Sequence, residues 1–210
     1  MARALIFDYN QVLADDLAAH TDAYKKAFKK FGVSVSSAEL KKLMHKTRNE
    51  KISYFKEKHG LKDCDERIFR EKDKEFLKIA NAKSLLFPGA AEALEKLGKK
   101  FSLGLFTGTN LEQMFIPKKT VELFKAIVTI KDYKKPKPDP EGLLLCVKLL
   151  GLAAEECAYI GDSAHDMAAA KAAGCKAIGI ITGAFSAEEL RKAGADMVIA
   201  NLNELEKTRL

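Results

Sequence analysis

Four polar residues follow apolar runs of the chain, and their side chains are of types that could act together on a phosphate ester. They are Asp8, Thr107, Lys135 and Asp162, which come after the runs at 4–7, 102–106, 126–130 and 157–160. A carboxylate can attack phosphorus and form a covalent intermediate. A hydroxyl and an ammonium group can stabilise the oxygens in transfer. Acids such as Asp162 and Asp166, four residues apart, suit Mg²⁺.

These apolar runs alternate with helical patterns from residue 84 onward. The strand-like runs lie at 102–106, 126–130, 157–160, 177–181 and 197–200, and the main helical stretches at 90–97, 141–150, 164–173 and 187–193. Such alternation is typical of a parallel sheet covered by helices on both faces. With residues 4–7, the sequence predicts an α/β fold with a Rossmann-like sheet of about six strands. Ligands bind at the carboxyl ends of such strands, so we expect the four polar residues to meet there.

The segment after the first strand has a helical pattern instead. We expect four helices, at about 17–31, 37–44, 49–59 and 65–80. Ser36 and Glu39 resemble a capping box. Gly32 follows the first helix in the position of a C-terminal cap, and the third helix is expected to stop at Gly60. The prediction is a small helical bundle at 16–83, inserted into a core made of residues 1–15 and 84–210.

Composition favours a single soluble chain with a substantial core. It has 210 residues, of which 47% are hydrophobic. The apolar stretches are shorter than the roughly 20 residues of a membrane span, and no signal-peptide pattern opens the chain. We therefore expect a cytoplasmic protein that does not bind membranes. The cysteines lack metal-binding or disulfide-like spacing, which indicates buried thiols at Cys64, Cys146, Cys157 and Cys175.

The formal charge of +7 is concentrated in the helical segment. Between residues 16 and 87, 18 Lys and Arg residues oppose 11 Asp and Glu residues, and the remaining sequence is neutral. One interpretation is an ordinary lysine-rich helical surface. The other is that the charge steers an anionic substrate toward the site. No nucleic-acid recognition motif accompanies the charge, so we expect no nucleic-acid partner.

The order of these motifs resembles the haloacid dehalogenase superfamily. The similarity is to its phosphatase-like branch with a helical cap, which includes phosphoglycolate phosphatases and β-phosphoglucomutases. The four family motifs are similar to residues 7–13, to Thr107, to Lys135 in a Lys-Pro-x-Pro-Asp setting and to residues 161–166. Pro88-Gly89 is similar to the return from the cap. The resemblance covers nearly the whole chain.

The resemblance implies a Mg²⁺-dependent hydrolase of small phosphorylated metabolites that works through an aspartyl-phosphate, as a monomer or homodimer. The nucleophile would be Asp8. The phosphoryl group would be held by Thr107, Lys135 and the backbone amides of Gly108 and Thr109. The implied metal ligands are Asp8, the backbone carbonyl of Asn10, Asp162 and Asp166. A mobile cap would exclude water and select the substrate.

Residue 10 departs from the family pattern. Phosphatases of this family usually carry Asp two residues after the nucleophile, where it protonates the leaving group and later activates water. Asn10 cannot transfer a proton at neutral pH, so a contribution of about 10²- to 10⁴-fold should be missing. Gln11 also replaces the usual Gly. The metal site is unaffected, because its ligand from residue 10 is a backbone oxygen.

Several explanations of Asn10 stay open at the level of sequence. The protein is a slow phosphatase for substrates whose leaving group needs little protonation, or a phosphate-binding or regulatory protein with little turnover. A third explanation is a deliberate Asp-to-Asn replacement that traps a complex. A 2-haloacid dehalogenase fits less well, because that branch resembles Asp-x-Tyr and does not need the predicted Mg²⁺ site.

One loop of the helical segment is a candidate for substrate recognition. Residues 46–50 loosely resemble the cap loop that reads substrates in sugar-phosphate mutases and phosphatases, although Lys46 stands where Gly is common. We expect Arg48 to contact the distal part of the substrate with help from Lys46. The alternative is a solvated loop between helices.

Overall fold

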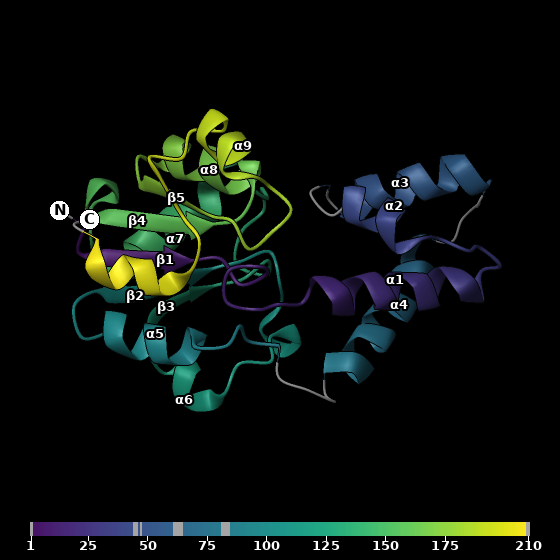
Figure 1. The fold of residues 1–210 in the computed structure, drawn as a ribbon, viewed down its shortest axis with the longest axis horizontal. Coiled ribbons are helices and arrows are strands. Elements are labelled where there is room, and N and C mark those ends of the chain that lie inside the picture. Colours follow the sequence, from purple (N-terminus) through teal and green to yellow (C-terminus); the bar gives the residue numbers. More distant parts are fainter. Residues whose placement is uncertain (1, 44–45, 47, 61–64, 81–84, 209–210) are drawn as a thin grey trace. The chain divides into compact units, whose positions relative to one another are not determined.

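The computed structural model describes residues 2–208 apart from 44–45, 47, 61–64 and 81–84 (Figure 1). The strands are β1 (Ala4–Phe7), β2 (Ser102–Phe106), β3 (Phe124–Val128), β4 (Cys157–Gly161), β5 (Lys176–Ile180) and β6 (Met197–Ile199). The helices are α1 (Leu17–Lys30), α2 (Ser37–Lys42), α3 (Arg48–His59), α4 (Asp65–Ala80), α5 (Ala90–Leu97), α6 (Lys118–Val121), α7 (Glu141–Leu150), α8 (Ala164–Ala173) and α9 (Ala187–Lys192). Short 3₁₀ helices are η1 (Leu111–Gln113), η2 (Ala154–Glu156) and η3 (Leu202–Lys207).

The six strands form one parallel sheet in the order β3-β2-β1-β4-β5-β6. The predicted α/β fold with a Rossmann-like sheet of about six strands is therefore confirmed. β1 lies in the middle, where Ala4 aligns with Ser102 on one side and with Cys157 on the other. All four residues of β1 are fully buried and apolar, as expected for a parallel strand covered on both faces.

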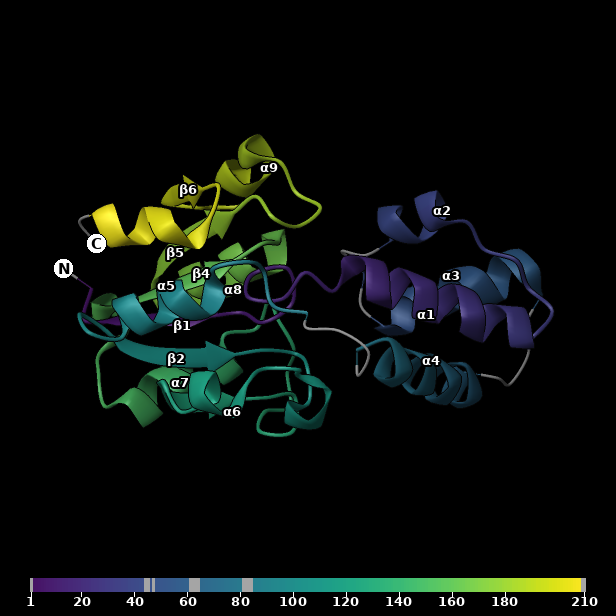
Figure 2. The ribbon, with the colours of Figure 1, turned by 60° about the horizontal axis from the view of Figure 1, so that its bottom comes forward.

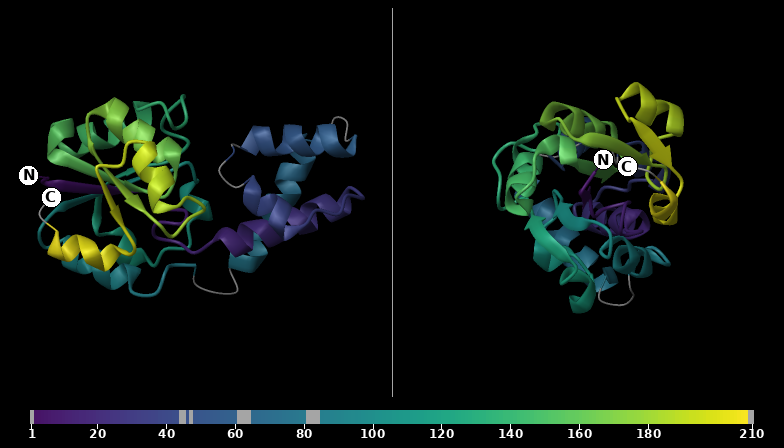
Figure 3. Two further views of the ribbon diagram at one scale, coloured as in Figure 1. Left: turned by 45° about the horizontal axis from the view of Figure 1, so that its top comes forward. Right: turned by 90° about the vertical axis from the view of Figure 1, so that its left-hand side faces the viewer.

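Helices cover both faces of the sheet. α7 packs on β2 and β3, and α8 on β4 and β5. α9 lies beside α8 on the same face, whereas α5, α6 and η3 lie on the other (Figure 2; Figure 3, right). The main core forms where α7 and α8 meet the sheet, with Ile6, Phe106, Leu143 and Met167 at its centre. This packing fixes the strand ends that carry the polar residues.

The chain divides into two compact units, of which the first comprises residues 1–15 and 85–210 and the second residues 16–84. The second unit consists of α1 to α4. It has its own apolar core, in which Phe28 contacts Phe55 with ring centroids 4.5 Å apart and Leu40 and Ile52 are buried. Among the described residues, no helix combines the length and apolarity needed to cross a membrane.

The polypeptide crosses between the two units at a small β-ladder that belongs to the first unit. Ala14 pairs antiparallel with Leu86. The amide of Asp15 donates to the carbonyl of Leu85 at 2.7 Å, and that of Phe87 donates to the carbonyl of Leu13 at 2.9 Å. The outgoing and returning segments are thus hydrogen-bonded to each other.

The structure corrects the predicted bounds of one strand and shows the burial of three cysteines. β3 begins at Phe124 and ends at Val128, two residues earlier than predicted, and Ile130 is 46% exposed. A turn ends the strand, because the amide and hydroxyl of Thr129 both donate to Asp132 at 2.8 Å. The predicted buried thiols are confirmed for Cys146, Cys157 and Cys175, while Cys64 lies outside the described residues.

Candidate active site

The carboxyl ends of the central strands bring the predicted residues to one edge of the sheet. Asp8 directly follows β1, and its amide donates to the carbonyl of Ile160 on β4 at 2.9 Å. Thr107 directly follows β2 and is held in the same way by Val128 of β3 at 3.0 Å. Asp162 directly follows β4. Neighbouring strands in register therefore fix the backbone of this edge.

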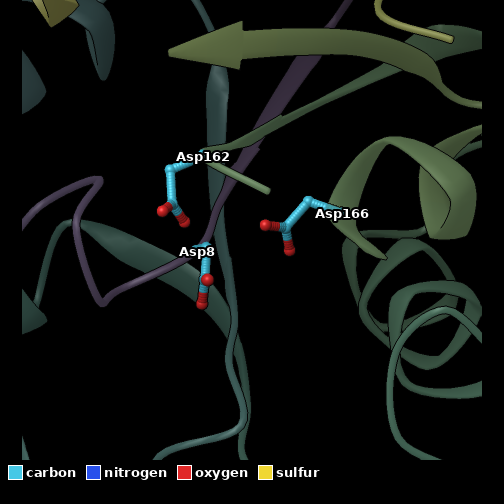
Figure 4. Close-up of side chains that lie close together, drawn as sticks. All are labelled: Asp8, Asp162 and Asp166. Carbon is cyan, nitrogen blue, oxygen red and sulfur yellow. The ribbon is translucent and has the colours of Figure 1, made fainter. Parts of the chain in front are cut away.

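Three carboxylates converge at this edge. Asp8, Asp162 and Asp166 each offer an oxygen, and these three oxygens lie within 4.8 Å of one another (Figure 4). Asp166 comes from the first turn of α8, where Ser163 caps the helix and donates its hydroxyl to Asp166 Oδ2 at 2.5 Å. A strand end, a loop and a helix start thus build one acidic cluster.

Lys137 is the cation of the cluster. Its Nζ lies 2.9 Å from Asp8 Oδ2 and 2.7 Å from Asp166 Oδ1, and its side chain is 15% exposed. Lys135, which the sequence analysis assigned to this place, is 72% exposed and lies 3.7 Å from Asp139 Oδ2. The prediction of Lys135 as the catalytic lysine is therefore wrong.

The loop geometry explains why Lys135 points away. The amides of Lys134 and Lys135 both donate to the carboxylate of Glu141, at 3.2 and 3.0 Å, which fastens this stretch to the start of α7. A Lys-Pro pair occurs twice in the loop, at 135–136 and at 137–138. The second pair was the signal in the sequence for the correct lysine, Lys137, which lies four residues before Glu141.

A buried tyrosine supports the lysine and was missed in the sequence analysis. Tyr159 of β4 accepts a hydrogen bond from Lys137 Nζ at 3.1 Å. Its own hydroxyl can donate to Asp166 Oδ1, at 3.0 Å, or to the carbonyl of Phe106, at 3.3 Å. Lys137 therefore has three oxygen partners, which fix its ammonium between the two carboxylates. The signal in the sequence was a tyrosine on a core strand three residues before Asp162.

Burial and mutual repulsion perturb the carboxylates unequally. Burial raises the pKa of Asp8 to about 6, with Lys137 opposing and Asp166 adding to the rise. Burial and the charges of Asp166 and Asp8 raise the pKa of Asp162 well above its ordinary value. Burial also acts to raise the pKa of Asp166, but Lys137, Ser163 and Tyr159 outweigh it, so this pKa is lowered. The cluster holds more negative charge than Lys137 alone balances.

The donor set fits a divalent cation. Three hard oxygen donors lie within 4.8 Å of one another, and Lys137 is the one ammonium group that contacts them among the residues the structure describes. Mg²⁺ prefers carboxylate oxygens and keeps several waters. Both oxygens of Asp166 already accept hydrogen bonds, from Lys137 and Tyr159 on one side and from Ser163 on the other. Asp166 is thus suited to hold such an ion through water, and Asp8 and Asp162 to hold it directly.

Two glycines make room for the acids. A Cβ on Gly161 would lie 2.2 Å from Cβ of Asp166, and a Cβ on Gly183 would lie 1.9 Å from Oδ2 of Asp162. No side chain fits at these distances, so the backbone approaches each acid directly. Gly183, which follows β5, escaped the sequence analysis because nothing in its local pattern distinguishes it from an ordinary loop glycine.

The loop after β2 contacts residue 10. The hydroxyl of Thr109 donates to Asn10 Oδ1 at 2.5 Å. The amide of Thr109 donates to the hydroxyl oxygen of Thr107 at 3.2 Å. The prediction that this amide faces a phosphate is therefore wrong, since it closes the turn. Thr109 instead orients Asn10, and Thr107 is fully buried beside it.

The candidate substrate-reading residues belong to the second unit. Lys46 Nζ lies 3.9 Å from Glu50 Oε1. Arg48 opens α3, but its side chain lies outside the described residues. Neither residue is placed relative to the acidic cluster, so their part in binding stays a prediction.

Metal binding should be visible in thermal unfolding. We expect Mg²⁺ at about 100 times its dissociation constant to stabilise the protein by roughly 2.7 kcal/mol, or about 5–10 °C in Tm. Asp162→Asn should abolish this shift. In EDTA at neutral pH, Asp162→Asn should have a higher Tm than the native chain, because it removes a buried carboxylate from the acidic cluster.

The pH dependence of the EDTA comparison follows from the raised pKa of Asp162. A carboxyl group whose pKa is raised in the folded protein is protonated there at low pH. The loss of folding free energy caused by ionising it appears as the pH rises above its pKa in the unfolded chain. The advantage of Asp162→Asn should therefore vanish toward pH 4. Equal Mg²⁺ shifts in both proteins, measured by differential scanning fluorimetry, would refute the site.

The family assignment follows from a comparison with family models. The model described as haloacid dehalogenase-like hydrolase matches residues 5–180. The chain belongs to this family. The matched range includes Asp8, Thr107, Lys137 and the acidic residues after β4, so the family match and the cluster coincide.

Individual relatives and solved structures agree with the assignment. Phosphoglycolate phosphatase from Salmonella typhi is 34% identical over 141 residues, which are 63% of this chain and 54% of the relative. This chain thus spans about half the length of the curated relatives it matches. A haloacid dehalogenase-like hydrolase structure from Bacteroides fragilis has a TM-score of 0.85 at 28% identity, covering 98% of this chain and 100% of that one.

A third comparison concerns a ligand complex. The structure of CbbY from Rhodobacter sphaeroides in complex with phosphate has a TM-score of 0.81 at 26% identity. The match covers 98% of this chain and 96% of that one. A solved phosphate complex thus has a fold closely similar to that of this chain.

Proposed function

We propose that this protein is a Mg²⁺-dependent phosphatase of small phosphorylated metabolites. The observation that carries the proposal is the bridge of Lys137 between Asp8 and Asp166, with Asp162 in reach of both acids. The phosphoglycolate phosphatases among the relatives and the phosphate complex of CbbY support the substrate class.

Asp8 would be the nucleophile. Its Oδ1 accepts the amide of Tyr9 at 2.7 Å and its Oδ2 faces Lys137, so the carboxylate is held in one orientation. Attack on phosphorus would give an aspartyl-phosphate and release the substrate's alcohol or acid; water would then restore Asp8. When bound by Asp8, Asp162, Asp166 and the carbonyl of Asn10, Mg²⁺ would neutralise charge on the phosphoryl oxygens.

The phosphate-holding groups would be Lys137, Thr107 and the amide of Gly108. Lys137 is a compact charge already fixed at the nucleophile, and it would attract the incoming dianion and keep Asp8 ionised. The hydroxyl of Thr107 accepts one hydrogen bond, from Thr109. This leaves its hydrogen as the donor for a phosphoryl oxygen.

Residues 16–84 would act as a cap that closes over the site and selects the substrate. The excess of Lys and Arg there supports attraction of an anion. Arg48 would contact the distal part of the substrate with help from Lys46. We expect Arg48→Ala to raise KM for the best substrate at least about tenfold with little change in kcat. An unchanged KM for every accepted substrate would eliminate this role.

A phosphate-binding protein with little turnover is the second candidate, and Asn10 is the observation that favours it. Hydrolysis of p-nitrophenyl phosphate with Mg²⁺ separates the two. The phosphatase proposal expects release of p-nitrophenol that EDTA stops and Asp8→Ala removes. Binding of inorganic phosphate without release of p-nitrophenol would favour the second candidate. Release that does not depend on Asp8 would exclude the proposed mechanism.

A further inference from the structure

Among the described residues of the first unit, the polar side chains that build the site around Asp8 are already engaged with other groups. Asn10 has its amide oxygen bonded to the Thr109 hydroxyl. Lys137 is engaged by two carboxylates and Tyr159. The hydroxyl of Tyr159 is buried against Asp166 and a backbone carbonyl. The carboxylates of Asp162 and Asp166 belong to the candidate metal site. Without a proton from these residues, a departing oxygen would leave as an anion.

We propose that the substrates of this site are phosphates of weakly basic leaving groups, above all acyl phosphates, and that a phosphorylated Asp8 accumulates during turnover. This inference rests on the proposed function and narrows its substrate class. Acyl phosphates release a carboxylate, which is stable as an anion in water. Alkyl phosphates release an alkoxide, which is strongly basic and departs only with a proton.

The first step balances without an acid. A carboxylate oxygen of Asp8 forms a bond to phosphorus, and the bond from phosphorus to the substrate's acyl oxygen breaks. The bonding pair leaves with that oxygen, which gives a free carboxylate. An acyl phosphate on Asp8 replaces an acyl phosphate in the substrate, so bonds of the same kind are broken and made. No proton moves.

The second step lacks a base at residue 10. Water must attack phosphorus while the bond from phosphorus to Asp8 breaks, and the two protons of the water pass to the phosphate product and to solvent. An amide such as that of Asn10 cannot take up a proton at neutral pH. The second step is therefore slower than the first, and the covalent form becomes the main species at steady state. General-base catalysis of this kind is worth about 10²- to 10⁴-fold.

Acetyl phosphate and ethyl phosphate form a matched pair for the test, since they differ only by a carbonyl oxygen in place of two hydrogens. kcat/KM reports steps up to formation of the covalent intermediate, so it isolates departure of the leaving group. Asn10→Asp should raise kcat/KM for ethyl phosphate about 10²- to 10⁴-fold, and for acetyl phosphate less than about tenfold. Comparing the two ratios cancels the intrinsic reactivity of each compound.

Mass spectrometry of the intact protein gives a second readout. During turnover of acetyl phosphate, most of the native chain should carry one phosphoryl group. Asn10→Asp should carry little and Asp8→Asn none. A similar effect of Asn10→Asp on both compounds would overturn the inference, because another part of the chain would then supply the proton. Consumption of neither compound by any variant would instead refute the phosphatase function itself.

Discussion

Replacing Lys137 by methionine should lower kcat for p-nitrophenyl phosphate about 10²- to 10³-fold, the range seen when one charge-stabilising donor is removed from an active site. Methionine retains the unbranched stem but has no ammonium group. Asp8 would lose the partner of its Oδ2, and the phosphoryl group would lose its fixed cation. The loss should affect kcat because the interaction strengthens as charge develops on the transferring oxygens.

Lys135→Met is the matched control, because it removes the same charge from the same loop. Lys135 is largely exposed and lies beside Asp139, so kcat should change less than about twofold, as is usual for surface substitutions. Circular dichroism and Tm of both variants distinguish lost chemistry from lost folding. Comparable losses in the two variants, or a larger loss for Lys135→Met, would show that the bridge of Lys137 is not the catalytic arrangement.

Asn10→Asp should raise kcat for p-nitrophenyl phosphate by about 10²- to 10⁴-fold, the contribution of a positioned general acid or base. p-Nitrophenolate departs readily without a proton, so the gain should come from hydrolysis of phosphorylated Asp8. An early burst of p-nitrophenol, one equivalent per protein, should precede slow turnover in the native chain. The burst should disappear in the variant.

The double variant Asp8→Asn with Asn10→Asp is the control for this gain. It places a carboxylate at residue 10 but removes the nucleophile, and it should be inactive. The hydroxyl of Thr109, which contacts Asn10 Oδ1 at 2.5 Å, should hold the new carboxylate in the same orientation. If kcat stays unchanged in Asn10→Asp, residue 10 does not limit turnover, and the slow step must be sought in substrate binding or product release.

Much of the candidate site could be predicted because a parallel sheet puts all its carboxyl ends at one edge. Asp8, Thr107 and Asp162 each follow a largely apolar strand, so their backbones had to meet. Asp166 could be predicted from its spacing, since four residues place it in the first turn of the following helix.

The lysine could not be predicted in the same way, because it lies in a loop rather than at a strand end. Lys135 and Lys137 have the same neighbour on their C-terminal side, a proline. The choice between them is made by hydrogen bonds from the backbone of residues 134 and 135 to Glu141. The predicted bounds of β3 were wrong for a related reason, because hydrogen bonds to a side chain decide where the strand ends. The apolar run continues to Ile130, but the turn between Thr129 and Asp132 ends the strand at Val128.

The sequence also could not predict roles that depend on contacts between residues far apart in the chain. Tyr159 could equally have been a core aromatic residue, and only the distances to Lys137 and Asp166 distinguish it. Gly183 is separated from Asp162 by the whole of α8 and β5. Tertiary contacts of this kind leave no local pattern in the chain.

The β-ladder at residues 13–15 and 85–87 has an engineering consequence. Because Asp15 is hydrogen-bonded directly to Leu85, the two ends of the excised segment would already be neighbours if residues 16–84 were deleted. A short turn such as Asn-Gly could join them as a β-hairpin without stretching the sheet. The inserted segment is thus topologically a loop of the larger domain, and modules of other sizes could be grafted at this junction while Asp8 kept its place at the end of β1.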